Sequence, residues 1–229
     1  MLEKLLHYER DLFFFLNGSD SVYWDHFMWL FSSKQVWYPL AFFILLLLCY
    51  KKHWKEVLLI LLSIVLVIIF CDQFASHFCK PFFARYRPTF HPDFKNQVDV
   101  VFGYRSGKYG FISSHAANAF GFATYMAMLL REKWFSFTIF LWATFNAYTR
   151  IYLGVHFISD VVCAAIAGFI FGYLGYKLYK IIRGKLLKSP IKPDALYSKK
   201  RKIVISAAIG VTVVLMLIFN EAIVDFLRS

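Results

Sequence analysis

The stretch Arg150-Ile-Tyr-Leu-Gly-Val-His156-Phe-Ile-Ser-Asp160 places a cation, an imidazole and a carboxylate at the start of an apolar segment. Ionisable side chains are costly beside a bilayer and therefore point to a functional site. If a helix begins near His156, its ring and the Asp160 carboxylate are four residues apart and share a face. Asp160 can then hold one ring nitrogen while the other is free to attack. The alternative is an interfacial histidine with an aspartate that the helix dipole favours.

A second stretch, Lys80-Pro-Phe-Phe-Ala-Arg-Tyr-Arg87-Pro88, closes another apolar segment. Its prolines favour a bent exit from a helix, which would turn both Lys80 and Arg87 inward. The alternative is snorkelling, in which a cation reaches the membrane interface along its own apolar stem. We prefer snorkelling for Arg85, in the middle of the stretch.

A third stretch, Ser113-Ser114-His115, opens a further apolar segment. The free N–H groups at a helix N-terminus suit an anion, and both serines can also donate their hydroxyls. A serine cap on the helix is compatible with this role. His115, just inside the helix, would be placed to protonate a leaving oxygen.

The composition indicates a membrane protein. Of 229 residues, 59% are hydrophobic, 21% are aromatic and only 17% are charged, which is more apolar surface than a soluble domain of this length can cover. The net charge of +12 would suit nucleic acid, but the basic residues flank apolar segments and form no single stripe, so we expect no nucleic-acid partner. The four cysteines show no CxxC spacing, and we expect buried free thiols.

Six segments are apolar enough to cross a bilayer, and we expect helices because backbone groups in lipid must be satisfied within the segment. They are residues 36–50, 56–79, 114–130, 134–149, 156–176 and 203–221. Arg131-Glu132-Lys133 should join two of them as a tight hairpin. The predicted architecture is all-α: a single membrane domain (1–229) with about six transmembrane helices.

Residues 2–16, within the N-terminal segment 1–20, predict an amphipathic helix on the membrane surface, and Asn17-Gly18-Ser19-Asp20 is a stop signal. The side chains expected towards lipid are Leu2, Leu5, Leu6, Leu12, Phe13 and Leu16. Those expected towards water are Glu3, Lys4, Arg10 and Asp11.

The distribution of Lys and Arg predicts the orientation. Loops 51–55, 131–133 and 177–202 hold 15 of the 26 Lys and Arg residues, against 8 on the opposite side when Lys80, Arg87 and Arg150 are set apart. The positive-inside rule places these loops in the cytoplasm. The segment 177–202 is then a basic cytoplasmic loop before the last helix (203–221), and the motifs within 80–160 face outward.

With alternate loops on opposite faces, all three stretches reach the same membrane face. Three cations, two imidazoles and one carboxylate can hold a phosphoryl group and transfer it without a metal. No second cluster of carboxylates offers metal ligands, so we expect neither a metal nor another cofactor.

The pattern Lys-x6-Arg-Pro, Ser-x-His and Arg-x5-His-x3-Asp resembles the type 2 phosphatidic acid phosphatase superfamily. That superfamily includes membrane lipid phosphatases and the soluble vanadium haloperoxidases. Its second motif is usually Pro-Ser-Gly-His, where this chain has Ile112 and Ser114 in place of Pro and Gly. Thr149 stands where the third motif usually has serine.

The resemblance implies a phosphohistidine mechanism without a metal. His156 would be the nucleophile and Asp160 would orient it. His115 would protonate the leaving group and then activate water. The residues implied to hold the phosphate oxygens are Lys80, Arg87, Ser113, Ser114 and Arg150.

A phosphatase site at a membrane surface favours a lipid phosphate whose tails stay in the bilayer. The loop 81–112 is long enough to fold over a headgroup. We expect Tyr104, Arg105 and Lys108 to contact it, the two cations at a second phosphate. Among the substrates that outward-facing bacterial members handle, lipid A phosphates and undecaprenyl pyrophosphate fit best, with phosphatidate and phosphatidylglycerol phosphate as alternatives. The expected location is the bacterial cytoplasmic membrane, with the site facing the periplasm.

Two other functional classes remain open, a transporter of anions or lipids and an inactive membrane scaffold. A transporter usually places paired charges at mid-bilayer and often has repeated halves. Here the charges gather at one end and no repeat is visible. The scaffold rests only on the altered second motif, so we favour the hydrolase.

Overall fold

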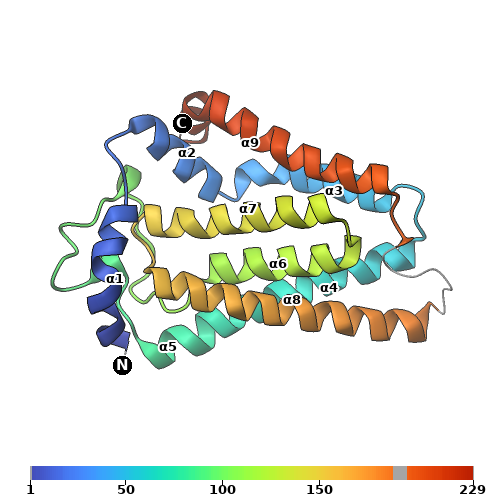
Figure 1. Cartoon of the computed structure of the whole chain (residues 1–229), viewed down its shortest axis with the longest axis horizontal. Coiled ribbons are helices and arrows are strands. Elements are labelled where there is room, and N and C mark those ends of the chain that lie inside the picture. Colours follow the sequence, from blue (N-terminus) through green and yellow to red (C-terminus); the bar gives the residue numbers. More distant parts are fainter. Residues whose placement is uncertain (1, 188–194, 229) are drawn as a thin grey trace.

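The computed structural model describes residues 2–187 and 195–228, and it confirms an all-α bundle (Figure 1). Its α-helices are α1 (Leu2–Leu16), α2 (Val22–Ser32), α3 (Tyr38–Cys49), α4 (Trp54–Gln73), α5 (Lys80–Phe83), α6 (Ser114–Leu130), α7 (Lys133–Tyr152), α8 (Ile158–Leu186) and α9 (Lys199–Arg228). The shorter helical turns are η1 (Gln35–Trp37), η2 (Phe74–Cys79), η3 (Pro88–Phe90) and η4 (Val101–Gly103).

Within the described residues, three helices are long and apolar enough to cross a membrane. They are the continuous helix Trp54–Phe83, which joins α4, η2 and α5, then α8, and then α9. A fourth crossing is present if α2 and the segment Gln35–Cys49, bent by 68°, form one span. The structure therefore shows three or four candidate spans where the sequence predicts about six. At 17 residues, α6 is about 26 Å long, slightly less than the hydrocarbon core of a bilayer.

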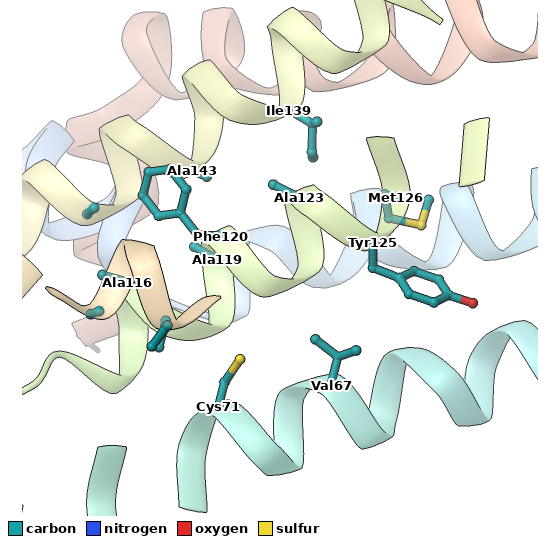
Figure 2. Close-up of a cluster of buried hydrophobic side chains, with 14 of the residues drawn as sticks. Val67, Cys71, Ala116, Ala119, Phe120, Ala123, Tyr125, Met126, Ile139 and Ala143 are labelled. Atoms are coloured by element: carbon teal, nitrogen blue, oxygen red, sulfur yellow. The ribbon is translucent and has the colours of Figure 1, made fainter. Parts of the chain in front are cut away.

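The core lies around α6, which runs through the middle of the bundle with α4, α7 and α8 beside it (Figure 1). Figure 2 shows small side chains of α6, such as Ala116 and Ala123, facing the buried cluster. Helix α8 approaches α6 through Gly168 and Gly172, where an added Cβ would lie 2.5 Å from the carbonyl oxygens of Ala117 and Gly121 respectively. Small residues spaced by four allow such backbone contact between membrane helices. This contact fixes the start of α8 beside the start of α6.

Several helix boundaries differ from the sequence prediction. The helix predicted to end at Cys79 continues to Phe83, because α4, the π-helical turn η2 and α5 follow one another without a break. Helix α8 runs to Leu186, so the first ten residues of the expected basic loop 177–202 are helical, and α9 already begins at Lys199. Residues 188–194 of that loop lie outside the described residues. The tight hairpin is confirmed: the Glu132 carboxylate accepts a hydrogen bond of 2.6 Å from the Phe135 N–H at the start of α7.

Helix α1 lies across one end of the bundle (Figure 1). Phe13, expected towards lipid, is fully buried, and its ring centroid lies 5.2 Å from that of Phe157. Leu6 is buried as well, whereas Leu12 is exposed. The predicted lipid face of α1 is thus partly a contact with the rest of the protein, where aromatic side chains such as Phe157 cover it. The orientation of side chains 2–5 lies outside what is described.

The expected stop after α1 is confirmed, and an unexpected helix follows it. The Asn17 amide donates to the Tyr152 carbonyl over 2.8 Å, and Gly18 has a φ of +67°. Helix α2 was not predicted from the sequence, because eleven residues are too few to span a bilayer alone. All four cysteines are free, but Cys49 is exposed, which corrects the expectation of burial there.

Candidate active site

The three sequence stretches meet at one end of the bundle, where α5 and α7 end and α6 and α8 begin (Figure 1). The Ser113 N–H donates to the Asp160 carbonyl over 3.2 Å. The Lys80 ammonium lies 3.4 Å from the Ser114 hydroxyl. Arg87 Nη1 lies 2.7 Å from His156 Nε2. Residues up to 80 positions apart in the sequence therefore form one cluster.

His156 is oriented so that its two ring nitrogens face different surroundings. Nε2 faces Arg87, whereas Nδ1 lies 3.5 Å from Asp160 Oδ2. Asp160 is fully buried, and the same Oδ2 accepts the Phe157 N–H over 3.0 Å. The Asp160 carboxylate therefore favours a proton on Nδ1, which leaves the Nε2 lone pair directed at Arg87.

This pairing does not arise from a shared helix face. Helix α8 begins at Ile158, so His156 lies in the preceding turn. The turn is held by the Val155 and His156 N–H groups, which both donate to the Arg150 carbonyl, over 3.1 and 3.2 Å. The third stretch is therefore one closed structural unit that carries both the cation and the imidazole.

The three predicted phosphate-binding cations lack carboxylate partners. Arg87 and Arg150 are 4% and 2% exposed, and within the described residues neither they nor Lys80 lies within 4.0 Å of a carboxylate oxygen. Arg150 instead donates to the hydroxyls of Ser32 and Tyr104. The Nε atoms of both arginines are buried and have no hydrogen-bond partner in the described part of the chain. Buried donors with uncompensated charge are suited to an anionic ligand.

These cations also affect the protonation state of His156. Burial, and then the charges of Arg87, Arg150 and Lys80, keep the pKa of His156 well below its ordinary value. Burial and the neighbouring Arg150 lower the pKa of Arg87 to about 10. His156 is consequently neutral near pH 7, the state that a nucleophilic imidazole requires.

His115 lines a cavity of about 570 Å³. Ser32, Lys34 and Tyr104 also line this cavity. Because Ser32 and Tyr104 both bind Arg150, the cavity adjoins one of the three cations predicted to bind phosphate. It provides room for a leaving group next to His115.

Two of the three expected headgroup residues do not reach this cavity. Tyr104 lines it, but Arg105 and Lys108 are exposed and do not. The Lys108 ammonium instead lies 5.2 Å from the centroid of the Tyr86 ring. Lys34, in the break between α2 and α3, takes the place expected for these cations. The polar run Ser32-Ser33-Lys34-Gln35 between two apolar segments is the sequence signal that marked it.

The prediction that Arg85 snorkels at the interface is wrong. Arg85 is 3% exposed, and its Nη1 donates to Asp160 Oδ1 over 2.7 Å. Its Nη2 forms an ion pair with Glu9 on α1, and its guanidinium lies 4.5 Å from the Phe157 ring centroid. A buried arginine is tolerated where carboxylates compensate its charge, and here two do.

A sequence profile described as the PAP2 superfamily matches residues 56–183, more than half of the chain. The chain belongs to the PAP2 superfamily. The matched region contains all three stretches, so the resemblance noted from their spacing is confirmed. The chain is accordingly a member of a phosphatase superfamily, and the phosphatase class is favoured over the transporter and the scaffold.

Individual relatives within the PAP2 superfamily agree with this assignment. A lipid A 4'-phosphatase of Porphyromonas gingivalis is 42% identical over 199 residues, which cover 86% of this chain and 84% of the relative. A lipid A 4'-phosphatase of Bacteroides thetaiotaomicron is 42% identical over 178 residues, covering 77% and 79%. The crystal structure of Aquifex aeolicus LpxE is similar with a TM-score of 0.53 and 30% identity, covering 74% of this chain and 94% of that one.

Proposed function

We propose that this PAP2 chain hydrolyses the 4'-phosphate ester of lipid A by a metal-independent phosphohistidine mechanism. The observation that carries the proposal is the buried cluster of Arg87, His156 and Asp160. Arg150 connects this cluster to the cavity that His115 lines, because it binds two other lining residues, Ser32 and Tyr104. The two relatives named lipid A 4'-phosphatases support this substrate over undecaprenyl pyrophosphate, phosphatidate and phosphatidylglycerol phosphate.

In the first step, His156 Nε2 attacks the phosphorus atom and forms a P–N bond, while the bond from phosphorus to the sugar oxygen breaks. His115 gives its proton to that oxygen, which leaves as the sugar hydroxyl. Burial and the charge of Arg150 disfavour the protonated ring in the free protein, so the negative charge of the bound phosphate is needed to favour it. Arg87, Arg150 and Lys80 hold the three equatorial oxygens and stabilise the charge that they carry in the transition state. Asp160 stabilises the positive charge that develops on the His156 ring.

In the second step, His115, now neutral, takes a proton from a water molecule. The water oxygen attacks phosphorus, the P–N bond breaks and inorganic phosphate leaves. The Ser114 N–H at the N-terminus of α6, where unpaired donors favour an anion, and the Ser114 hydroxyl beside Lys80 face the phosphate. The Ser113 N–H, which the sequence also predicts to bind phosphate, already donates to the Asp160 carbonyl. No step uses a metal ion, and the described residues contain no group of three or more His, Cys, Asp or Glu side chains placed to hold one.

We also propose that the chain crosses the bacterial cytoplasmic membrane six times, with α6 and α7 spanning beside the candidate spans and the active site facing the periplasm. The positive-inside count supports this orientation. A single cysteine at Asn96, in the exposed loop before α6 and in a background without the native cysteines, should react with an impermeant thiol reagent on intact cells. Labelling that requires lysis contradicts the orientation.

The function is tested with detergent-purified protein, EDTA and a panel of lipid phosphates that contains lipid A and the three alternatives. We expect phosphate release from lipid A to persist in EDTA and to fall at least about a thousandfold in His156→Ala, because the nucleophile is lost. Equal release by both proteins, or loss of release in EDTA, contradicts the mechanism. Faster release from another lipid of the panel contradicts the substrate.

A further inference from the structure

We propose that Glu9 and Arg85 are positioning residues for the carboxylate of Asp160. Helix α1 therefore contributes a residue that supports the active site. This inference rests on the proposed function, in which Asp160 orients the nucleophile. Glu9 lies outside the three motifs, and Arg85 occupies one of the unspecified positions of the pattern Lys-x6-Arg-Pro. Both are brought to Asp160 only by the fold.

The contacts form a continuous chain from α1 to the nucleophile. Glu9 pairs with Nη2 of Arg85, and Nη1 of Arg85 donates to Asp160 Oδ1 over 2.7 Å. The other oxygen of Asp160 faces Nδ1 of His156 at 3.5 Å. The side chains of Arg85 and Asp160 are 2% and 0% exposed, and that of Glu9 is 11% exposed. Solvent therefore screens these charged contacts only weakly.

Glu9 also fixes the first turn of α8. Its Oε2 accepts the Ser159 N–H over 2.8 Å, and its Oε1 accepts the Ser159 hydroxyl over 2.9 Å. A carboxylate on the free N–H groups of a helix start acts as a cap supplied from another helix. Phe13, one turn further along α1, packs against Phe157 in the same region. The position of α1 and the start of α8, which carries Asp160, are thus linked.

The charges explain why Asp160 needs both Arg85 and Glu9. Asp160 has one oxygen for Arg85 and one for His156, so the guanidinium fixes the rotation of the carboxylate about its own axis. Without Glu9, the positive charge of Arg85 would weaken the attraction between Asp160 and a positive charge on the His156 ring. Because Glu9 compensates Arg85, the group Glu9, Arg85 and Asp160 has a net charge of about −1. This charge stabilises the positive charge that develops on the His156 ring. Such charges have large effects because they are buried.

The same electrostatics predict how the pH profile responds. The acid limb of kcat/KM reports protonation of the free nucleophile. Removing the Glu9 charge makes protonation of His156 less favourable and moves this limb to lower pH, whereas removing the Arg85 charge moves it to higher pH. The charged and titratable groups around His156, from every element packed against it, are Lys80, Arg85, Arg87, His115, Arg150, Asp160 and, behind Arg85, Glu9.

The experiment compares Glu9→Gln, Arg85→Gln, their double variant and the control Asp11→Asn on the lipid phosphate that the wild type hydrolyses. Glu9→Gln keeps the shape of the side chain and a hydrogen-bond acceptor for Ser159. Asp11 is exposed on the same helix, so its variant makes the same change in net charge away from the site. Gel filtration and the Tm report folding.

We expect Glu9→Gln to lower kcat about tenfold with KM changed less than about twofold, since the cations that bind phosphate are intact. Arg85→Gln should lower kcat further. Adding Glu9→Gln to it should have little additional effect, because the glutamine keeps an acceptor for Ser159 and the lost charge of Glu9 acts on Asp160 through Arg85. The acid limbs of the two single variants should shift by about 0.3 pH units in opposite directions. Asp11→Asn should match the wild type in all three measurements.

The proposal is overturned if folded Glu9→Gln behaves like Asp11→Asn, if the two effects are additive, or if both acid limbs move in the same direction. The sign of the pH shift is read from the residual activity, so lower stability does not mimic it. Failure of the proposed function looks different: wild-type protein would then release no phosphate from lipid A, or His156→Ala would release it equally well.

Discussion

The two ends of the bundle both bury arginine, and they use it differently. At the end away from the active site, Arg183 of α8 pairs with Glu56 of α4, its Nε lying 2.9 and 3.0 Å from the two carboxylate oxygens. Tyr179 adds a hydrogen bond of 2.6 Å to the same carboxylate. At the other end, Arg87 and Arg150 are equally buried but lack a carboxylate partner in the described part of the chain.

The difference indicates that the presence of a carboxylate partner, and not burial, distinguishes a structural cation from a ligand-binding one. Where a carboxylate pairs with the guanidinium, as Glu56 does with Arg183, the pair joins two helices and its charge is compensated. Where none does, the fold retains an unfavourable charge that an anionic substrate relieves. Arg85 resembles the first kind although it lies at the second end, and this marks it as a residue that supports the site.

The largest expected effect comes from an unpaired cation. Arg87→Met should lower kcat/KM about a hundred- to a thousandfold, because a buried donor to the transferred phosphoryl group is lost. Its Tm should be no lower than that of the wild type, since the lowered pKa of Arg87 means that the fold disfavours its charged form. Phosphate-release assays and thermal unfolding in detergent measure both. A clear loss of Tm with activity retained would place Arg87 among the structural cations.

The paired end should respond in the opposite way. Glu56→Gln leaves Arg183 buried without a carboxylate and should cost about 3 kcal/mol of stability, seen as a lower Tm. The kcat of the surviving folded protein should be unchanged. The double variant Glu56→Leu/Arg183→Leu should recover most of the loss, because both charges are removed together. A fall in kcat without a fall in Tm contradicts the contrast between the two ends.

A smaller effect is expected where the backbone passes the site. A Cβ at Gly110 would lie 3.0 Å from Arg87 Cγ and 3.2 Å from Asp160 Oδ2. Gly110→Ala should therefore displace both and lower kcat about tenfold, measured by the same assay. Gly107→Ala is the matched control, since nothing lies within 4 Å of its added Cβ. Similar activity of the two variants shows that this contact does not position the site.

The smallest effect concerns the headgroup. Lys34→Met should raise the KM of a lipid with two phosphates severalfold more than that of the same lipid with one. Lys34 lines the cavity beside His115, and no carboxylate oxygen of the described residues lies within 4.0 Å of it. Lys108→Met tests the expectation drawn from the sequence. If it has the larger effect, the loop before α6, and not the break after α2, contacts the second phosphate.

The spacing of the three stretches was enough to predict that six ionisable side chains gather at one end of a helical bundle. Each stretch lies at the end of an apolar segment, and the alternation of segments across a membrane leaves little freedom in where those ends lie. The start of α6 at Ser114 and the stop after Leu16 were readable for the same reason, since caps and breaks are local. The start of α8 was misplaced by two residues because a side-chain contact of Asp160 sets it.

Arg85 was misjudged because its neighbours in the sequence say nothing about its partners. Glu9 lies 76 residues away and Asp160 lies 75 residues away, so only the docking of α1 on the start of α8 makes Arg85 a buried cation. Lys34 was missed in the same way, since it reaches the cavity through the bend after α2.

Apolar segments and their end signals are local, so they were sufficient to predict an all-α membrane bundle, and the motifs supplied the resemblance to this superfamily. Which cations have carboxylate partners and which remain available to a ligand depends on the tertiary structure. Electrostatic pairing acts through space over a few ångströms, and residues far apart in sequence supply both partners.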